Sequence, residues 1–413
     1  MARTLDVYLE EQLVGHLLQD DGGQMLFRYA PAWLESSECF PISRSLPLRE
    51  DEFKQKECKG FFGGILPEQS NRKTIATILQ ISDKNDFAML ERIGGECAGA
   101  LTFVPEGEQP QRTDSDYRQL SDAELTEILE TLPKRPLLAG EKGVRLSLAG
   151  AQDKIAVRLD ADGKLSLPLN DAPSTHILKP AIATWEGLVS NETYCMALAQ
   201  AVGLQAAPTT AHRIGEIEYL LSERYDRAID GDGTIRRLHQ EDFCQALGIP
   251  SETKYQAEGG PGLKDCFALL RHASSNAVAD LRELLNAVVF NLLVGNNDAH
   301  AKNYSILYGR KGKARLAPLY DLVCTVYYPE IENKLAMKIG GEDDPDLIHP
   351  NEIEAFAKEA GLAVAATKRS VLGLAELVRE KTAEIDQPDG TSEELAKLIV
   401  DRCESVLARF EQG

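Results

Sequence analysis

A short polar window in the C-terminal half of the chain holds the side chains with the clearest chemical potential. It contains Asp298 and Asn303, and Asp321 follows farther along. Transfer of a phosphoryl group from a nucleotide needs a carboxylate that accepts the proton of the attacking hydroxyl, and an amide and a carboxylate oxygen that bind Mg²⁺. The spacing Asp-x₄-Asn is also that of the catalytic loop in protein kinases. The window therefore predicts phosphoryl-transfer chemistry.

The spacing alone is weak, because it occurs a second time. Asp346 and Asn351 also have it, but Pro350 lies between them and the next aspartate is Asp386. A polar loop with capping Asn and Asp residues would show the same letters without a catalytic role. On the spacing alone, both interpretations stay open.

The elements around the window are more informative than its spacing. Residues 280–294 repeat leucine and valine at helical intervals, and Gly295 ends the pattern. Residues 304–308 and 315–320 are typical of a hairpin with a basic turn, and Asp321 follows its second strand. We therefore expect a helix, a polar loop and a hairpin to position the two aspartates.

A second segment, residues 147–154, has the composition of a phosphate-binding loop. Its small residues Ala149, Gly150 and Ala151 allow the backbone to approach phosphate oxygens, and Lys154 can add a positive charge. The segment is neither a Walker A sequence nor the Gly-x-Gly-x-x-Gly of kinases, so an ordinary hairpin turn is an open alternative.

Two charged residues could complete the phosphate site. Lys179 lies near the end of the predicted strand 176–179, where a kinase strand lysine contacts the α- and β-phosphates. Glu192, on the predicted helix 191–202, could hold this lysine in an ion pair. The alternative is that both side chains are exposed, which is the more common fate of each type.

Residues 220–227 pass from an apolar strand to the polar run Glu223-Arg224-Tyr225-Asp226. In two-lobed kinases such a crossing carries the backbone groups that pair with adenine. The alternative is an edge strand with an Arg–Asp pair on the surface, which contributes little.

Composition and charge exclude several classes of protein. The 413 residues are 43% hydrophobic and 27% charged, as in an ordinary soluble protein with room for two or three domains. The net charge of −20 argues against a non-specific nucleic-acid binder, which needs clustered Lys and Arg. There is no signal-peptide core and no apolar run of membrane-spanning length. Scattered cysteines without a Cys-x₂-Cys pair predict reduced thiols, no structural zinc and a cytoplasmic location.

The predicted elements place a strand-rich region before a helical one, a layout that suits a nucleotide cleft between two lobes. Residues 86–94 form a predicted helix, 105–117 a linker, and Ser121 opens another helix with a capping box. Residues 350–410 are mainly helical. The other strands are predicted at residues 5–9, 24–29, 145–148, 155–159 and 217–221.

Several stretches, taken in order, resemble the HipA-type serine/threonine kinases, the toxin components of bacterial toxin–antitoxin pairs. They reach from the N-terminal region to about residue 340, so the resemblance covers most of the chain. Together they are far more specific than any one of them. They are Phe61-Phe-Gly-Gly-Ile-Leu-Pro67, Gly95-Glu-Cys-Ala-Gly-Ala100, Ser147-Leu-Ala-Gly-Ala-Gln-Asp-Lys154, His176-Ile-Leu-Lys-Pro180, Glu223-Arg-Tyr-Asp226, Leu238-His-Gln-Glu-Asp-Phe-Cys-Gln-Ala-Leu-Gly248, Lys254-Tyr255 with Gly259-Gly-Pro-Gly262, and the Asp298 window with Asp321.

The resemblance implies an α+β, two-lobed protein-kinase-like fold with a small β-rich N-terminal lobe and a larger α-helical C-terminal lobe. It implies three parts: an N-terminal α+β subdomain (1–110), an ATP-binding β-rich lobe (111–222) and a helical kinase lobe (223–413). It also implies ATP and Mg²⁺ as cofactors. Asp298 resembles the catalytic base, and Asn303 and Asp321 resemble the Mg²⁺ ligands. The implied nucleotide contacts are Ala149, Gly150, Ala151, Gln152, Asp153, Lys154, Lys179, Glu223, Arg224, Tyr225, His300, Ala301, Lys302, Asn303, Tyr320 and Asp321.

The family pattern also implies regulation and partners. Ser147 is similar in position to the serine whose autophosphorylation inactivates these kinases, because a phosphate beside ATP's own phosphates is repelled. The implied partners are a HipB-like helix-turn-helix antitoxin, operator DNA reached mainly through it, and an aminoacyl-tRNA synthetase substrate such as glutamyl-tRNA synthetase. Asp153 and Tyr225 stand where Glu and Phe are frequent in the family. Residues 341–350 cannot be aligned with it.

Two other functions use the same residues. Kinases of lipids or small molecules share the Asp-x₄-Asn arrangement, and a catalytically inactive co-repressor scaffold could keep only the nucleotide fold. Phosphate transfer to protein would separate the first from the kinase toxin, and loss of toxicity on substitution of Asp298 would exclude the second.

Overall fold

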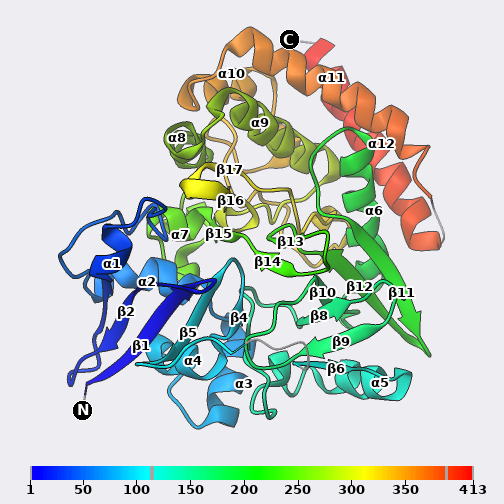
Figure 1. The fold of residues 1–413 in the computed structure, drawn as a ribbon. Coiled ribbons are helices and arrows are strands. Elements are labelled where there is room, and N and C mark those ends of the chain that lie inside the picture. Colours follow the sequence, from blue (N-terminus) through cyan, green and yellow to red (C-terminus); the bar gives the residue numbers. More distant parts are fainter. Residues whose placement is uncertain (1, 112–115, 387–388, 412–413) are drawn as a thin grey trace. The chain divides into compact units, whose positions relative to one another are not determined.

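The computed structural model describes residues 2–111, 116–386 and 389–411. The chain forms two compact units, each assembled from separate segments (Figure 1). The first comprises Met1–Pro180, His212–Ser251 and Leu307–Ala314; the second comprises Ala181–Ala211, Glu252–Ile306 and Arg315–Gly413. The division at residues 110 and 222 remains a prediction.

The first unit contains an antiparallel sheet whose alternating apolar residues face a core. Its strand order is β3-β2-β1-β5, and Leu5, Val7 and Phe27 are fully buried. Helix α2 (Gln55–Gly64) packs against β3, and α4 (Asp86–Ile93) packs against β5. The strands are β1 (Arg3–Leu9), β2 (Gln12–Gln19), β3 (Met25–Tyr29) and β5 (Leu101–Pro105). The predicted strands 5–9 and 24–29 and the helix ending at Gly94 are confirmed; β2 was not predicted.

A six-stranded sheet has the order β11-β12-β10-β8-β9-β6. Three of the predicted strands, 155–159, 176–179 and 217–221, are confirmed as β8, β10 and β12. Helix α5 (Asp122–Thr131) begins with the predicted capping box: the Glu124 N–H donates to Ser121 Oγ, and the Ser121 N–H donates to the Glu124 carboxylate. The strands are β6 (Tyr117–Gln119), β8 (Ile155–Leu159), β9 (Leu165–Pro168), β10 (His176–Pro180), β11 (Thr209–Ile214) and β12 (Ile217–Glu223).

Shorter elements complete this part of the chain. The predicted strand 145–148 is only β7 (Leu146–Ser147), which pairs in parallel with β4 (Glu96–Cys97). The predicted hairpin near residue 310 is present but shorter than expected, since its second strand ends at Leu316. The others are α1 (Pro31–Leu34), α3 (Gln69–Leu79), α7 (Phe243–Leu247), and strands β13 (Arg227–Ile229), β14 (Ile235–Arg237), β15 (His239–Asp242), β16 (Ser305–Tyr308) and β17 (Ala314–Leu316).

The second unit is mainly helical, as expected (Figure 1). Helix α9 is the predicted helix before the polar window of Asp298, and it packs against α8, α11 and α12. Gly295 ends it with φ +75°, and a Cβ there would lie 2.4 Å from Val326. The helices are α6 (Leu188–Ala201), α8 (Leu263–Ala273), α9 (Ala277–Val294), α10 (Pro350–Glu359), α11 (Val364–Thr382) and α12 (Gly390–Glu411).

Two further predictions concern the whole chain. Within the described part, no cysteine forms a disulfide, and Cys195, Cys244 and Cys266 are buried. No described helix combines the length and the apolar composition needed to cross a membrane. Of the predicted linker 105–117, residues 112–115 lie outside the described residues.

Candidate functional site

The carboxylate of Asp298 stands in a loop that is fixed at several points. The backbone N–H of Asp298 donates to Asn296 Oδ1 at 3.3 Å, and its carbonyl accepts from the His300 N–H at 2.7 Å. The Asn297 N–H donates to Thr325 Oγ1 at 2.8 Å. The loop is therefore anchored on both sides of Asp298. The catalytic role of Asp298 remains a prediction.

Asn303 and Asp321 are the predicted Mg²⁺ ligands. Asn303 Nδ2 donates to the Asp298 carbonyl at 3.1 Å, which leaves the side-chain oxygen of Asn303 for a cation. Asp321 has φ +58°, a left-handed conformation that a non-glycine residue adopts at some energetic cost. An amide oxygen and one carboxylate suit Mg²⁺, which completes its shell with water and substrate phosphates. This donor set fits the ion.

The residues on either side of these ligands are packed into the same unit. His300, Ala301 and Lys302 are all buried. The Tyr320 hydroxyl lies 2.6 Å from the Lys302 carbonyl and 2.7 Å from Ser305 Oγ. These contacts link the segment before Asp321 to the catalytic loop.

The predicted phosphate loop belongs to the first unit and is held by residues that precede α3 or lie in it. The Glu68 N–H donates to the Gly150 carbonyl at 3.2 Å, and Asn71 Nδ2 donates to the Ala151 carbonyl at 3.0 Å. Lys154 Nζ folds back to the Ala149 carbonyl at 2.9 Å. Gly150 has φ +105°, and a Cβ there would lie 2.6 Å from this ammonium group. The segment is therefore a loop that Glu68 and Asn71 hold in place, with Lys154 folded back onto its backbone. These contacts distinguish it from a simple hairpin turn.

Ser147 precedes this loop and is fully buried. Its hydroxyl donates to the Ile65 carbonyl at 3.0 Å, and its backbone is part of the β4–β7 pair. Within the loop, burial raises the pKa of Asp153 above its ordinary value, against a hydrogen bond from Asn71 and the charge of Lys154. A phosphate on Ser147 would not fit in this arrangement.

Lys179 and Glu192 are both buried, with exposed fractions of 7% and 3%. The alternative that placed them on the surface is wrong. Lys179 lies in β10 of the first unit, and Glu192 lies in α6 of the second. Their ion pair remains a prediction.

The side chain of Arg224 is fully engaged by the fold. Its Nε donates to Asp226, Nη1 to Glu96 and Ser174, and Nη2 to Asp226 and the Cys97 carbonyl, at distances of 2.8 to 3.1 Å. These contacts use all five N–H groups of the guanidinium. The surface-pair alternative is wrong, and the guanidinium of Arg224 has no N–H group left for a nucleotide.

Glu96 lies at the centre of the same buried cluster. It accepts a hydrogen bond from Arg227 at 2.7 Å, in addition to Arg224, and forms an ion pair with Arg237 at 2.5 Å. Burial alone would raise the pKa of Glu96, but the three guanidinium charges outweigh it and lower the pKa to about 2. The cluster anchors the residues predicted to hold adenine to β4.

Two residues that contact predicted site residues, Gln240 and Tyr255, had no assigned role in the sequence. The Tyr225 hydroxyl donates to Gln240 Oε1. The Tyr255 hydroxyl donates to Asp298 Oδ1 at 2.9 Å. Both lie in stretches that resemble the HipA-type kinases, and that resemblance was the only signal in the sequence that could have found them.

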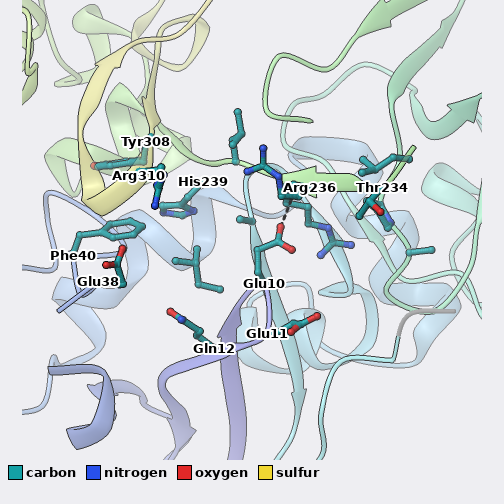
Figure 2. A pocket seen from close by; sticks show the side chains of 18 of the residues that line it. Glu10, Glu11, Gln12, Glu38, Phe40, Thr234, Arg236, His239, Tyr308 and Arg310 are labelled. Carbon is teal, nitrogen blue, oxygen red and sulfur yellow. Dashed lines mark hydrogen bonds between the residues drawn. The ribbon is translucent and has the colours of Figure 1, made fainter. Parts of the chain in front are cut away.

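The first unit contains a cavity of about 980 Å³. Figure 2 shows Phe40, His239 and Tyr308 on one side of it. Several of its charged side chains already have partners. The Glu10 carboxylate accepts from the backbone N–H of Arg237 at 2.6 Å, and the Lys311 ammonium lies 3.4 Å from the Glu38 carboxylate. Among the residues that the structure describes, the predicted nucleotide contacts do not line this cavity. It is therefore separate from the predicted site.

Comparisons with known proteins show the family of this chain. The HipA N-terminal domain matches residues 5–104, and the HipA-like C-terminal domain matches residues 146–385. Y4mE of Sinorhizobium fredii, a candidate kinase by name, is 46% identical over 93% of this chain and 92% of its own length. The serine/threonine-protein kinase toxin HipA of Shewanella oneidensis is 32% identical over 87% of this chain and 84% of its own length.

A solved structure gives the same result for the fold. The complex of Shewanella oneidensis HipA with HipB and its operator DNA contains a chain that superposes with a TM-score of 0.87 and 29% identity. The match covers 99% of this chain and 98% of that one. The predicted kinase-like α+β fold is confirmed, and the chain belongs to the HipA family of serine/threonine kinase toxins.

Proposed function

We propose that this chain is an ATP- and Mg²⁺-dependent protein serine/threonine kinase and the toxin of a toxin–antitoxin pair. The observation that carries the proposal is the anchored loop of Asp298, in which Asn303 is oriented by the Asp298 carbonyl itself. Membership of the HipA family and a named kinase toxin among the relatives support it.

In the first unit, the proposal assigns nucleotide contacts to three elements. The loop from Ala149 to Lys154 holds the phosphates through its backbone N–H groups and its lysine. The Lys154 ammonium would leave the Ala149 carbonyl and bind a charged phosphate oxygen in its place. The buried Lys179 adds a second charge at the α- and β-phosphates. The backbone from Glu223 to Tyr225 pairs with adenine.

In the second unit, the proposal assigns the reaction itself. Asp298 accepts the proton of the substrate hydroxyl as that oxygen attacks the γ-phosphorus. Asn303 and Asp321 hold Mg²⁺, which when bound neutralises charge on the phosphates. His300, Ala301, Lys302 and Tyr320 line the nucleotide.

The partners follow from the family. We propose a HipB-like antitoxin, operator DNA contacted mainly through that antitoxin, and an aminoacyl-tRNA synthetase, such as glutamyl-tRNA synthetase, as the substrate whose phosphorylation arrests growth. The Shewanella oneidensis complex, which contains HipB and operator DNA, supports the first two. The net charge of −20 supports an indirect contact with DNA.

Autophosphorylation of Ser147 is proposed to switch the kinase off. The hydroxyl of Ser147 is fully buried against Ile65, so it becomes an acceptor only when the loop leaves its position. The added charge of about −1.5 to −2 would then keep the loop away from ATP's phosphates.

Transfer of phosphate to protein tests the proposed function. The purified chain is incubated with Mg²⁺-ATP, alone and with a cell extract, and phosphoproteins are identified by mass spectrometry. Asp298→Asn should lower the rate by roughly 10²- to 10⁴-fold, because the general base is lost. Asp346→Asn, at the second Asp-x₄-Asn spacing, should leave the rate unchanged.

Two results would contradict the proposal. Phosphate found only on a lipid or a small molecule would indicate a kinase of another class. An Asp298→Asn chain that arrests growth as well as the parent would indicate a scaffold without catalysis.

A further inference from the structure

The hydroxyl of Tyr255 lies where it can act directly on the proposed catalytic base. It donates a hydrogen bond to Asp298 Oδ1 at 2.9 Å. A hydrogen bond to an ionised carboxylate is stronger than one between neutral groups and fixes the orientation of the acceptor.

The ring of Tyr255 is held in place. It packs edge-to-face against His300, with ring centres 5.2 Å apart and an interplanar angle of 75°. The Tyr255 carbonyl accepts from the Gly260 N–H at 2.9 Å. The next residue, Gln256, donates its backbone N–H to the Ala336 carbonyl at 3.2 Å. Its side-chain oxygen accepts from the Lys338 N–H at 2.7 Å. The backbone around the tyrosine is thus fixed by its own loop and by the segment 336–338.

One glycine makes this arrangement possible. A Cβ on Gly260 would lie 2.2 Å from the Thr253 carbonyl oxygen and 2.7 Å from that of Tyr255. These oxygens belong to the backbone and cannot move aside as a side chain could, so the close return of the chain behind Tyr255 requires glycine at this position.

We propose that Tyr255 is a positioning residue for Asp298: its hydroxyl occupies Oδ1 and directs Oδ2 towards the acceptor hydroxyl of the substrate. The backbone of Asp298 is fixed by Asn296 and His300, and the Tyr255 hydroxyl constrains the side chain at Oδ1. This inference rests on the proposed kinase function.

Tyr255 could instead be a phosphate acceptor, because its hydroxyl stands at hydrogen-bond distance from the base. An acceptor must approach the γ-phosphate and leave with the phosphate attached. A ring packed on His300, with its backbone bonded to Gly260, is not free to make that movement. The structure therefore favours the positioning role.

Tyr255→Phe tests the inference, since it keeps the ring and removes only the hydroxyl. We expect kcat for phosphate transfer to fall about 10-fold or more, because the loss of one oriented hydrogen bond in the transition state has this effect. The KM for ATP should stay within about twofold of the parent value, since the nucleotide contacts are assigned elsewhere. The melting temperature should be unchanged.

The matched control is Tyr194→Phe, which removes a tyrosine hydrogen bond to the Thr382 carbonyl in the same unit. It should leave kcat at the parent value. Tyr255→Phe with an unchanged kcat, or with kcat and melting temperature lowered together, would overturn the positioning role. So would phosphate mapped to Tyr255 in the parent. A parent that phosphorylates no protein would instead refute the proposed function, and this role with it.

Discussion

At the scale of single residues, the second aspartate of the site has an unusual backbone. Asp321 adopts φ +58°, a conformation that Asp and Asn tolerate better than other side chains. Asp321→Asn should therefore keep the local structure and remove only the charge that attracts Mg²⁺. We expect the Mg²⁺ concentration for half-maximal phosphate transfer to rise roughly 10- to 100-fold.

The measurement is a Mg²⁺ titration of activity at fixed ATP. Asp343→Asn, which removes a carboxylate paired with Lys338 at 3.2 Å, serves as the control and should not change the titration. A Mg²⁺ requirement of Asp321→Asn equal to that of the parent would remove Asp321 from the ligand set.

The sequence revealed those site residues whose partners are close along the chain. Asp298, Asn303 and Asp321 fall in one segment, so their types and spacing could be read together. Arg224 was open to a surface interpretation because its partner Glu96 is 128 positions away. The partner of Tyr255 is 43 positions away. Hydrogen bonds over such separations are set by the fold and leave no local pattern.

At the scale of elements, β4 supplies the buried carboxylate of Glu96 to three arginines. Glu96→Gln should destabilise the chain by about 3–5 kcal/mol at neutral pH, because it leaves buried guanidinium charge without its counter-charge. Since the folded pKa of Glu96 is lowered to about 2, this contribution is present above pH 4.5 and is lost as the pH falls towards 2. The free energies of unfolding of Glu96→Gln and the parent should therefore become equal in acid.

Urea unfolding at several pH values measures this difference. Glu91→Gln breaks an ion pair with Arg3 at the surface and should cost less than about 1 kcal/mol. Equal stabilities of Glu96→Gln and the parent at neutral pH would show that the ion pairs of Glu96 do not hold β4 to Arg224 at the end of β12.

A second buried carboxylate, Glu241 in β15, forms no ion pair with any residue that the structure describes. It accepts from Ser43 Oγ at 2.5 Å, from the Arg44 N–H at 2.9 Å and from the Tyr308 hydroxyl. Burial raises its pKa to about 7, and these hydrogen bonds only partly oppose the shift. Its stabilising contribution is complete below pH 4.5 and is lost as the pH rises through 7.

Glu241→Gln mimics the protonated side chain and should not show this loss. Relative to the parent, it should gain about 3 kcal/mol of stability between pH 5 and pH 8, the free-energy equivalent of the shift. Denaturant unfolding at both pH values is the measurement, with Glu91→Gln as a control that follows the parent. Parallel curves for Glu241→Gln and the parent would contradict a protonated Glu241.

The elements themselves could be predicted where the periodic pattern is long. Helix α9 and strands β8, β10 and β12 have repeats of apolar residues that indicate only one type of secondary structure. The predicted strand 145–148 shrank to the two residues of β7, because its partner β4 is itself two residues long. Strand length depends on the partner, which local sequence does not specify.

At the scale of the whole molecule, both HipA domains match in order, and the buried Ser147 lies within the C-terminal match. We expect the chain to lose nucleotide binding as it phosphorylates itself, because the phosphate loop would leave its contacts with Ile65, Glu68 and Asn71. Ser147→Ala should keep binding a fluorescent ATP analogue throughout the same incubation with Mg²⁺-ATP.

Removal of the Ser147 hydroxyl leaves the Ile65 carbonyl without that donor, a cost of about 1–3 kcal/mol that a melting curve would detect. Ser370→Ala, which removes a hydroxyl bonded to Asn286 at 2.8 Å, is the control and should lose nucleotide binding as the parent does. If Ser147→Ala lost binding at the parent's rate, inactivation would come from another residue. If neither chain lost binding while both gained phosphate, the loop would tolerate the modification, and its burial would have no regulatory consequence.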